Sequence, residues 1–146
     1  MRRYLVVANQ TLGGEHLAEA IRTRLARGPS NFHVVVPATQ RQDQAVWTEG
    51  EARALATKRL EAAVARFRGL GADVEGEVGD ERPLEAIADA VREREFDEII
   101  LSTLPPGLSR WLRQDLPHRV ERQFDLPVQH VVGDPEPAES TGSTPG

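Results

Sequence analysis

The sequence contains no cysteine among its 146 residues, which excludes disulfide bonds, thiolate chemistry and metal sites built on cysteine. Lysine is almost absent as well, since Lys58 is the only one and the other basic residues are arginines. No stretch approaches the roughly 18 apolar residues that a membrane-spanning helix needs. The first apolar run covers only residues 4–8, too few for the core of a signal peptide. We therefore expect a cytoplasmic protein without a membrane span.

A basic excess is also missing, because 18 basic residues stand against 23 acidic ones and the net charge is −5 at pH 7. Nucleic-acid-binding proteins usually show the opposite balance, so no nucleic-acid partner is expected. Apolar residues make up 39% of the chain and charged residues 28%, which is typical of a folded globular domain. The length favours one domain over two.

Five short segments have the composition of strands, and apolar residues at helical spacing fill the intervals between them. The strands are predicted at residues 4–8, 32–36, 72–78, 99–101 and 126–132. Helical segments are predicted around apolar faces at 17–25, 56–67 and 84–91, and at 109–124 with a restart near Pro117. Thr48 and Glu51, at capping-box spacing, open the second of these helices, and Pro83 opens the third. The first and fourth strands are continuously apolar, as strands buried on both faces are. The third alternates with Asp73, Glu75 and Glu77, which indicates an edge strand with one exposed face.

This alternation predicts a single-domain Rossmann-like α/β fold: a five-stranded parallel sheet of order 3-2-1-4-5 with helices on both faces. The domain is expected to cover residues 1–132. Residues 133–146 are rich in Pro, Gly, Ser, Thr and Glu and are expected to form a flexible tail. In such folds ligands bind at the carboxyl ends of the strands, here between the first and fourth.

The candidate ligand-binding residues follow the first, second and fourth strands. They are Asn9, Gln10, Thr11, Gly13, Gly14, Pro37, Thr39, Ser102, Thr103, Gly107, Ser109, Arg110 and Arg113. Gly13 and Gly14 stand where a helix begins, so their amides either bind an anion or merely allow a tight turn. Neither a phosphate-loop motif nor a G-x-G-x-x-G motif is present to decide between the two.

An arginine cluster follows the fourth strand. Spacings of three residues place Arg110 with Arg113, and Arg119 with Arg122, on one face of a helix. Such a face either holds a phosphate or the carboxylates of a partner, or is a solvated surface paired with neighbouring acids.

Catalytic and metal-binding patterns are not found. The histidines His16, His33, His118 and His130 show no i,i+4 pair and no H-E-x-x-H motif. His33 and His130 fall within predicted strands, which favours a structural role. No G-x-S-x-G nucleophile motif occurs. We expect no metal site and no catalytic residues.

Four motifs lie in a fixed order along the chain: YLVVAN at residues 4–9 with a following glycine, GDERPLEAI at 79–87, FDEIILS at 96–102 and LPVQHVV at 126–132. Together they resemble the universal stress protein family over residues 2–132. Residues 102–117 look like a divergent actinobacterial-type branch of it. The resemblance implies an adenine nucleotide alpha hydrolase-like fold, a role in stress response and, in many members, a dimer.

The family's ATP-binding members carry G-x2-G-x9-G-[S/T] after the fourth strand, and the same spacing falls here on Ser102, Pro105, Asp115 and Leu116. Pro105 has no backbone N–H to offer a phosphate. Asp115 would repel a phosphate by about 1 kcal/mol at ~4 Å even in bulk water. Asn9 stands where the family has an aspartate. These departures predict that ATP is not bound tightly and that no cofactor is needed.

The sequence therefore favours a universal-stress-protein-like binding or regulatory module without catalysis. One alternative is an ATP- or AMP-binding member with weak hydrolysis. Another is a small-molecule site at the junction of the first and fourth strands, built from Asn9, Thr39, Ser102 and Arg110.

The last strand lacks the charges that guard the third, so a homodimer is expected to pair through it. Its interface would be Val128, Gln129, His130, Val131 and Val132. Alternation places Val128, His130 and Val132 on one face and the other two on the opposite face. A monomer whose tail covers this edge is the alternative.

Overall fold

A computed structural model describes residues 1–39 and 49–133. Its strands are β1 (Arg2–Val7), β2 (Ser30–Pro37), β3 (Asp73–Gly79), β4 (Glu98–Thr103) and β5 (Val128–Val132). Its helices are α1 (Glu15–Arg27), α2 (Glu49–Gly69), α3 (Pro83–Glu93), α4 (Arg110–Arg113) and α5 (Leu116–Phe124). The flexible tail predicted at 133–146 lies, after its first residue, outside the described residues.

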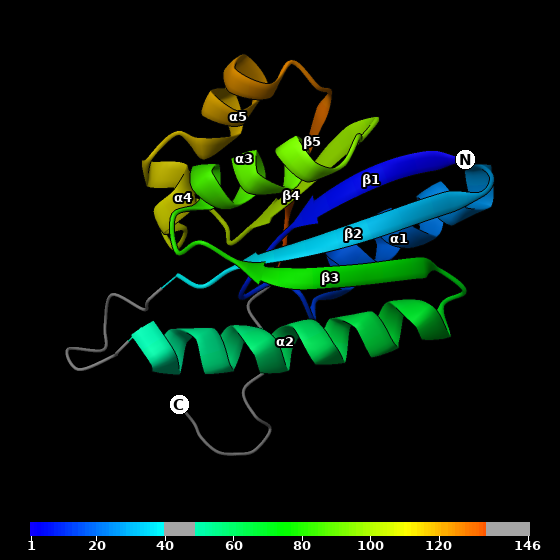
Figure 1. Cartoon of the computed structure of the whole chain (residues 1–146), viewed down its shortest axis with the longest axis horizontal. Coiled ribbons are helices and arrows are strands. Elements are labelled where there is room, and N and C mark those ends of the chain that lie inside the picture. Colours follow the sequence, from blue (N-terminus) through cyan, green and yellow to red (C-terminus); the bar gives the residue numbers. More distant parts are fainter. Residues whose placement is uncertain (40–48, 134–146) are drawn as a thin grey trace.

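The strands form one parallel sheet in the order β3-β2-β1-β4-β5, which confirms the predicted fold and strand order. Helices α1 and α2 cover one face, and α3, α4 and α5 cover the other (Figure 1). β1 is in register with both neighbours, so that Val6 lies opposite Val34 of β2 and Ile100 of β4. The carboxyl ends of β1, β2 and β4 consequently meet at one edge of the sheet.

Two apolar clusters hold the layers together, one on each face of the sheet. Tyr4 and Phe32 stack with ring centroids 5.2 Å apart beneath α1 and α2, and Phe67 of α2 is fully buried there. On the opposite face, Ile87 of α3 and Val120 of α5 pack against β1 and β4. The continuous apolar character of residues 4–8 and 99–101 thus reflects strands that are covered on both faces, as predicted.

The helical segment predicted at 109–124 forms two helices, α4 and α5. Asp115 between them has φ 57° and ψ 38°, a left-handed conformation that ends α4 and redirects the chain. Pro117 occupies the first turn of α5, where its missing N–H costs no hydrogen bond. The restart predicted at this proline is therefore confirmed, and α5 begins one residue earlier.

The observed bounds of both edge strands differ slightly from the predicted ones. β3 covers Asp73–Gly79 and not residues 72–78. β5 begins at Val128 and not at residue 126, because Pro127 takes part only through its carbonyl oxygen, which accepts the N–H of Ile99 at 2.9 Å. At the other edge, β3 presents Glu77 to the buried His33 of β2, with Oε2 2.8 Å from Nε2. His33 thus has a structural role, as expected from its position within a strand.

None of the helices in the described ranges has both the length and the apolar composition to cross a membrane.

Candidate functional site

The predicted site residues that follow β1 and β4 do meet. The hydroxyl oxygens of Thr11 and Ser102 lie 2.5 Å apart, and both side chains are buried. Thr103 is also buried, and its hydroxyl lies 2.7 Å from Nε2 of His130 on β5. Each of these hydroxyls thus has a hydrogen-bond partner within the protein, and burial of the three side chains keeps them away from a ligand.

Asn9 is occupied at both ends of its side-chain amide. Its Nδ2 donates to the carbonyl oxygen of Pro37 at 2.7 Å, and its Oδ1 accepts from Arg59 of α2 at 2.6 Å. Asn9 therefore ties the ends of β1 and β2 to α2, while its neighbour Gln10 is exposed.

The glycine turn has the geometry of a tight turn. The amide of Gly14 donates to the carbonyl of Thr11 at 3.0 Å, and the carbonyl of Gly13 accepts from Arg66 of α2 at 2.7 Å. Arg66 also pairs with Glu15 at 3.0 Å. Since the Gly14 amide is used within the turn, this geometry favours the tight-turn alternative over anion binding.

The loop after β4 is likewise satisfied by its own groups. The carbonyl of Pro105 accepts the N–H groups of Leu108 and Ser109, and the buried Ser109 hydroxyl accepts the N–H of Leu112 at 3.1 Å. Ser109 is thus the N-cap of α4. Gly107 has φ +92° and faces open space.

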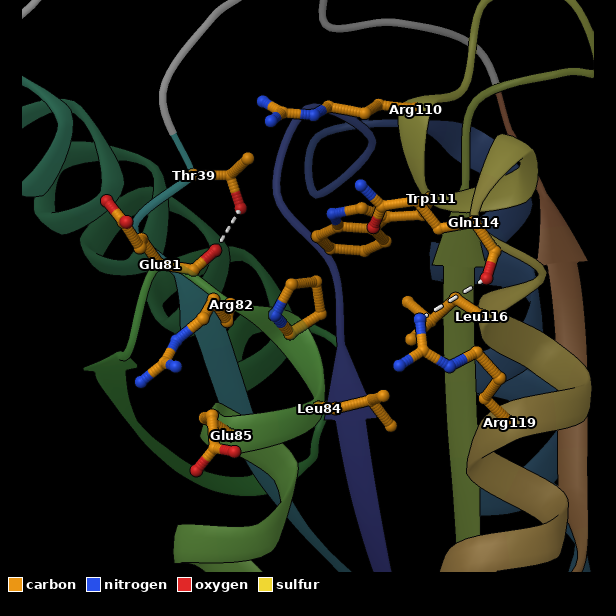
Figure 2. Close-up of a pocket in the computed structure, with 11 residues that line it drawn as sticks. Thr39, Glu81, Arg82, Leu84, Glu85, Arg110, Trp111, Gln114, Leu116 and Arg119 are labelled. Carbon is orange, nitrogen blue, oxygen red and sulfur yellow. Dashed lines mark hydrogen bonds between the residues drawn. The ribbon is translucent and has the colours of Figure 1, made fainter.

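A pocket of about 630 Å³ lies beside these loops, between the start of α3 and the two helices α4 and α5 (Figure 2). It is lined by Thr39, Glu81, Arg82, Pro83, Leu84, Glu85, Arg110, Trp111, Gln114, Leu116 and Arg119. Of the predicted site residues, only Thr39 and Arg110 are among them. The pocket is within the range of volumes that bind small molecules.

The arginine cluster is divided differently from the prediction. Arg110 and Arg119 line the pocket together although they belong to different helices, whereas Arg113 and Arg122 do not line it. The left-handed turn at Asp115 changes the direction of the chain between α4 and α5. Arg113, a predicted ligand-binding residue, does not line this pocket.

The two sides of the pocket differ in how their charges are held. On the α3 side, Arg82 binds Asp80 through its backbone N–H and its guanidinium, which lowers the pKa of that carboxyl. On the α5 side, Arg119 donates to the carbonyl oxygen of Gln114 at 3.4 Å. The hydroxyl of Thr39 donates to the carbonyl of Glu81 at 3.1 Å and closes the upper rim.

Asp115 and Leu116, which stand at the spacing of the family's nucleotide motif, also have contacts within the protein. Asp115 accepts a hydrogen bond from Nδ1 of His118 at 3.0 Å, and Leu116 is buried in the apolar cluster. In the described part of the chain, no three histidine, aspartate or glutamate side chains group closely enough to hold a metal ion.

Comparisons with known proteins identify solved structures that share this fold. No protein-family model and no curated protein matches the sequence. Among solved structures, a universal stress protein in complex with cAMP superposes with a TM-score of 0.61 at 17% identity, over 91% of this chain and 98% of the other.

Two further structures agree. A universal stress protein from Archaeoglobus fulgidus in complex with dAMP gives a TM-score of 0.57 at 17% identity, over 90% and 98% of the two chains. A universal stress protein family protein from Arabidopsis thaliana with AMP bound gives 0.59 at 12% identity, over 98% and 97%. At such identities the comparison shows the fold: this chain is built like a universal stress protein along nearly its whole length.

Proposed function

We propose that this universal-stress-protein-like domain is a non-enzymatic binding or regulatory module in stress response that does not bind ATP in the family's manner. The observation that carries the proposal is the closed hydrogen-bonding network at the carboxyl ends of β1 and β4. Thr11 and Ser102 are buried and hydrogen-bonded to each other, and both ends of the Asn9 amide are taken by Pro37 and Arg59. A nucleotide at these strand ends would have to break several of these bonds.

The loop after β4 supports the same conclusion. Pro105 and Pro106 have no N–H, and the amides of Leu108 and Ser109 already donate to the carbonyl of Pro105. Asp115 adds a carboxylate at the beginning of α5, where a triphosphate would otherwise find the positive end of the helix dipole. Neither backbone amides nor charge favour phosphate there.

An ATP- or AMP-binding role with weak hydrolysis is the second candidate. It is favoured by the AMP, dAMP and cAMP complexes of the structural relatives and by the pocket beside the strand ends, which has an indole and three guanidinium groups. The sequence also suggested a small-molecule site built from Asn9, Thr39, Ser102 and Arg110. Only Thr39 and Arg110 line the pocket, so these four residues do not form one site.

Calorimetric titration with ATP and magnesium, and separately with AMP, tests the proposal. We expect no dissociation constant in the micromolar range for ATP, and no rise in melting temperature at millimolar concentrations. A ligand present at 100 times its Kd would stabilise the fold by about 2.7 kcal/mol, which a melting experiment detects easily. A micromolar Kd for ATP would overturn the proposal in favour of the second candidate.

The proposed module is a cytoplasmic homodimer that pairs through β5. The free edge of β5 supports this, since Gln129, His130 and Val132 are exposed and Val132 is 39% accessible. Val131 contributes differently from the sequence-based expectation: it is buried in the apolar cluster beneath α1 and α2. The dimer contact is therefore proposed to use the backbone edge and Val132.

A further inference from the structure

The floor of the pocket is apolar and formed by three different helices. Trp111 of α4 and Leu116 of α5 are 8% and 2% exposed, and Leu84 with Pro83 of α3 faces them. Figure 2 shows the indole of Trp111 with Leu84 and Leu116 below it. Such a floor takes up a ring or a short apolar chain, since burying apolar surface there removes it from water.

The charged groups around this floor are arranged asymmetrically. Figure 2 shows the guanidinium of Arg119 directed across the hollow toward Leu84, and that of Arg110 reaching over the mouth toward Thr39. The carboxylates of Glu81 and Glu85 are directed away from the hollow in the same view. The groups that face an occupant are therefore positively charged.

The backbone around the pocket offers few donors to a phosphate chain. Both α3 and α5 have a proline in their first turn, Pro83 and Pro117, where phosphate-binding helices present free N–H groups. The guanidinium of Arg119 donates a long hydrogen bond, 3.4 Å, to the neutral carbonyl of Gln114. A guanidinium held in this way can turn its planar donor pair to a carboxylate, which it binds through two parallel hydrogen bonds.

We infer that this pocket binds a small amphipathic carboxylic acid, with its apolar part on Trp111, Leu84 and Leu116 and its carboxylate on Arg119. The volume of about 630 Å³ accommodates an aromatic acid or a medium-length alkyl acid. The carboxylate pairs with Arg119, whereas a triphosphate would bring more negative charges than the guanidinium groups facing the hollow balance.

The inference rests on the proposed function in that it makes this pocket, and not the strand ends, the binding site of the module. Calorimetric titration of the full chain with benzoate, 2-naphthoate, indole-3-acetate and octanoate tests it, with 2-naphthamide as the uncharged match to the second acid and AMP as the nucleotide. At least one acid is expected to bind with a sub-millimolar Kd, and the amide at least about tenfold more weakly.

Matched variants on one helix locate the site. Arg119→Gln is expected to raise the Kd of the acid at least about tenfold, whereas Arg122→Gln, an exposed residue of α5 outside the pocket, leaves it unchanged. Melting temperatures close to wild type for both variants show that the fold is intact.

The outcomes separate the two proposals. Failure of every acid, equal binding of acid and amide, or equal loss in both variants overturns the carboxylate inference and leaves the proposed absence of ATP binding standing. Binding of AMP that depends on Arg119, without binding of any acid, overturns the inference and makes the pocket a nucleotide site. Micromolar binding of ATP, whatever the acids do, overturns the proposed function.

Discussion

Arg24 of α1 forms a buried ion pair with Glu98 at the start of β4, with Nη2 2.8 Å from Oε2. The arginine side chain is 2% exposed and the glutamate 14%. Arg24 also donates to the carbonyl of Ala20 at 3.1 Å and to Gln129 of β5, and its guanidinium carbon lies 5.4 Å from the centre of the Tyr4 ring. One arginine thus joins α1 to three strands of the sheet.

Replacement of Arg24 by methionine is expected to lower the free energy of unfolding by about 3 kcal/mol, because it leaves the largely buried carboxylate of Glu98 with only the exposed Arg2, at 4.0 Å. Urea unfolding measures the loss. Arg22→Gln on the exposed side of the same helix is the control, and its effect is expected to be much smaller. Equal effects of the two substitutions would contradict the structural role of Arg24.

Replacement of Gly76 by alanine is expected to destabilise the fold by about 1–3 kcal/mol. A Cβ atom on this residue of β3 would lie 2.6 Å from Cδ1 of Leu60 and 2.6 Å from the carbonyl oxygen of Val34, and the second of these is backbone that cannot move freely. Gly69→Ala at the end of α2 is the control, since nothing lies within 4 Å of its Cβ. It is expected to leave stability unchanged or raise it slightly. Thermal or urea unfolding of both variants measures the difference.

His130 is expected to make the fold less stable as the pH falls below neutrality. Burial lowers the pKa of His130 in the folded chain below its ordinary value, so the unfolded chain binds the proton more readily. Its contribution is present above about pH 6.5 and is lost as the pH falls through and below that value. Unfolding free energies measured between pH 8 and pH 5 in about half-unit steps should therefore decline less for His130→Gln than for wild type. His16→Gln is the control for removing a histidine; identical pH dependence of wild type and His130→Gln would refute the linkage.

Val132→Pro is expected to abolish dimerisation through β5 while leaving the monomer folded. The carbonyl of Pro127 and the N–H of Gly133 both bond to β4, so backbone alternation turns the N–H of Val132 to the free edge. A proline there removes an edge donor without breaking the β4 ladder. Sedimentation at tens of micromolar reports the association state. A wild-type monomer, or a dimer that survives the substitution, would show that β5 is not the interface.

Val131→Pro would not serve the same purpose. Val131 is buried, and the same alternation turns its N–H toward β4. Its substitution would therefore disturb the fold itself and would say nothing specific about the dimer.

The sheet could be predicted from the sequence because its signals are local. Two continuous apolar runs, at 4–8 and 99–101, favour central positions, and the acids of 73–77 favour an edge; the observed order satisfies both conditions. Arg24 shows the limit of this reasoning. It lies three residues after Ile21 on the inner face of α1, a signal that could have been noticed, but its partner Glu98 lies 74 residues away.

The pocket could be predicted only in part. Thr39 and Arg110 follow strands directly, so the rule that sites lie at strand ends finds them. Leu84, Trp111 and Leu116 look like ordinary core residues in the sequence, and only the approach of α3 to α4 and α5 gathers them into a hollow. That approach depends on the left-handed turn at Asp115. Because this position is an aspartate and not a glycine, the sequence does not indicate the turn.

The strand order has a consequence for how the chain is made. The first 79 residues contain β1, β2 and β3 together with α1 and α2. Three adjacent strands and the helices that cover one face of the sheet are therefore synthesised before β4. Until Glu98–Thr103 follows, one side of β1 has no neighbour, and of α3, α4 and α5, which cover the opposite face, only α3 precedes β4 in the chain. A chain whose synthesis stops before β4 would expose the unpaired apolar edge of β1, so incomplete translation products of this protein are expected to aggregate.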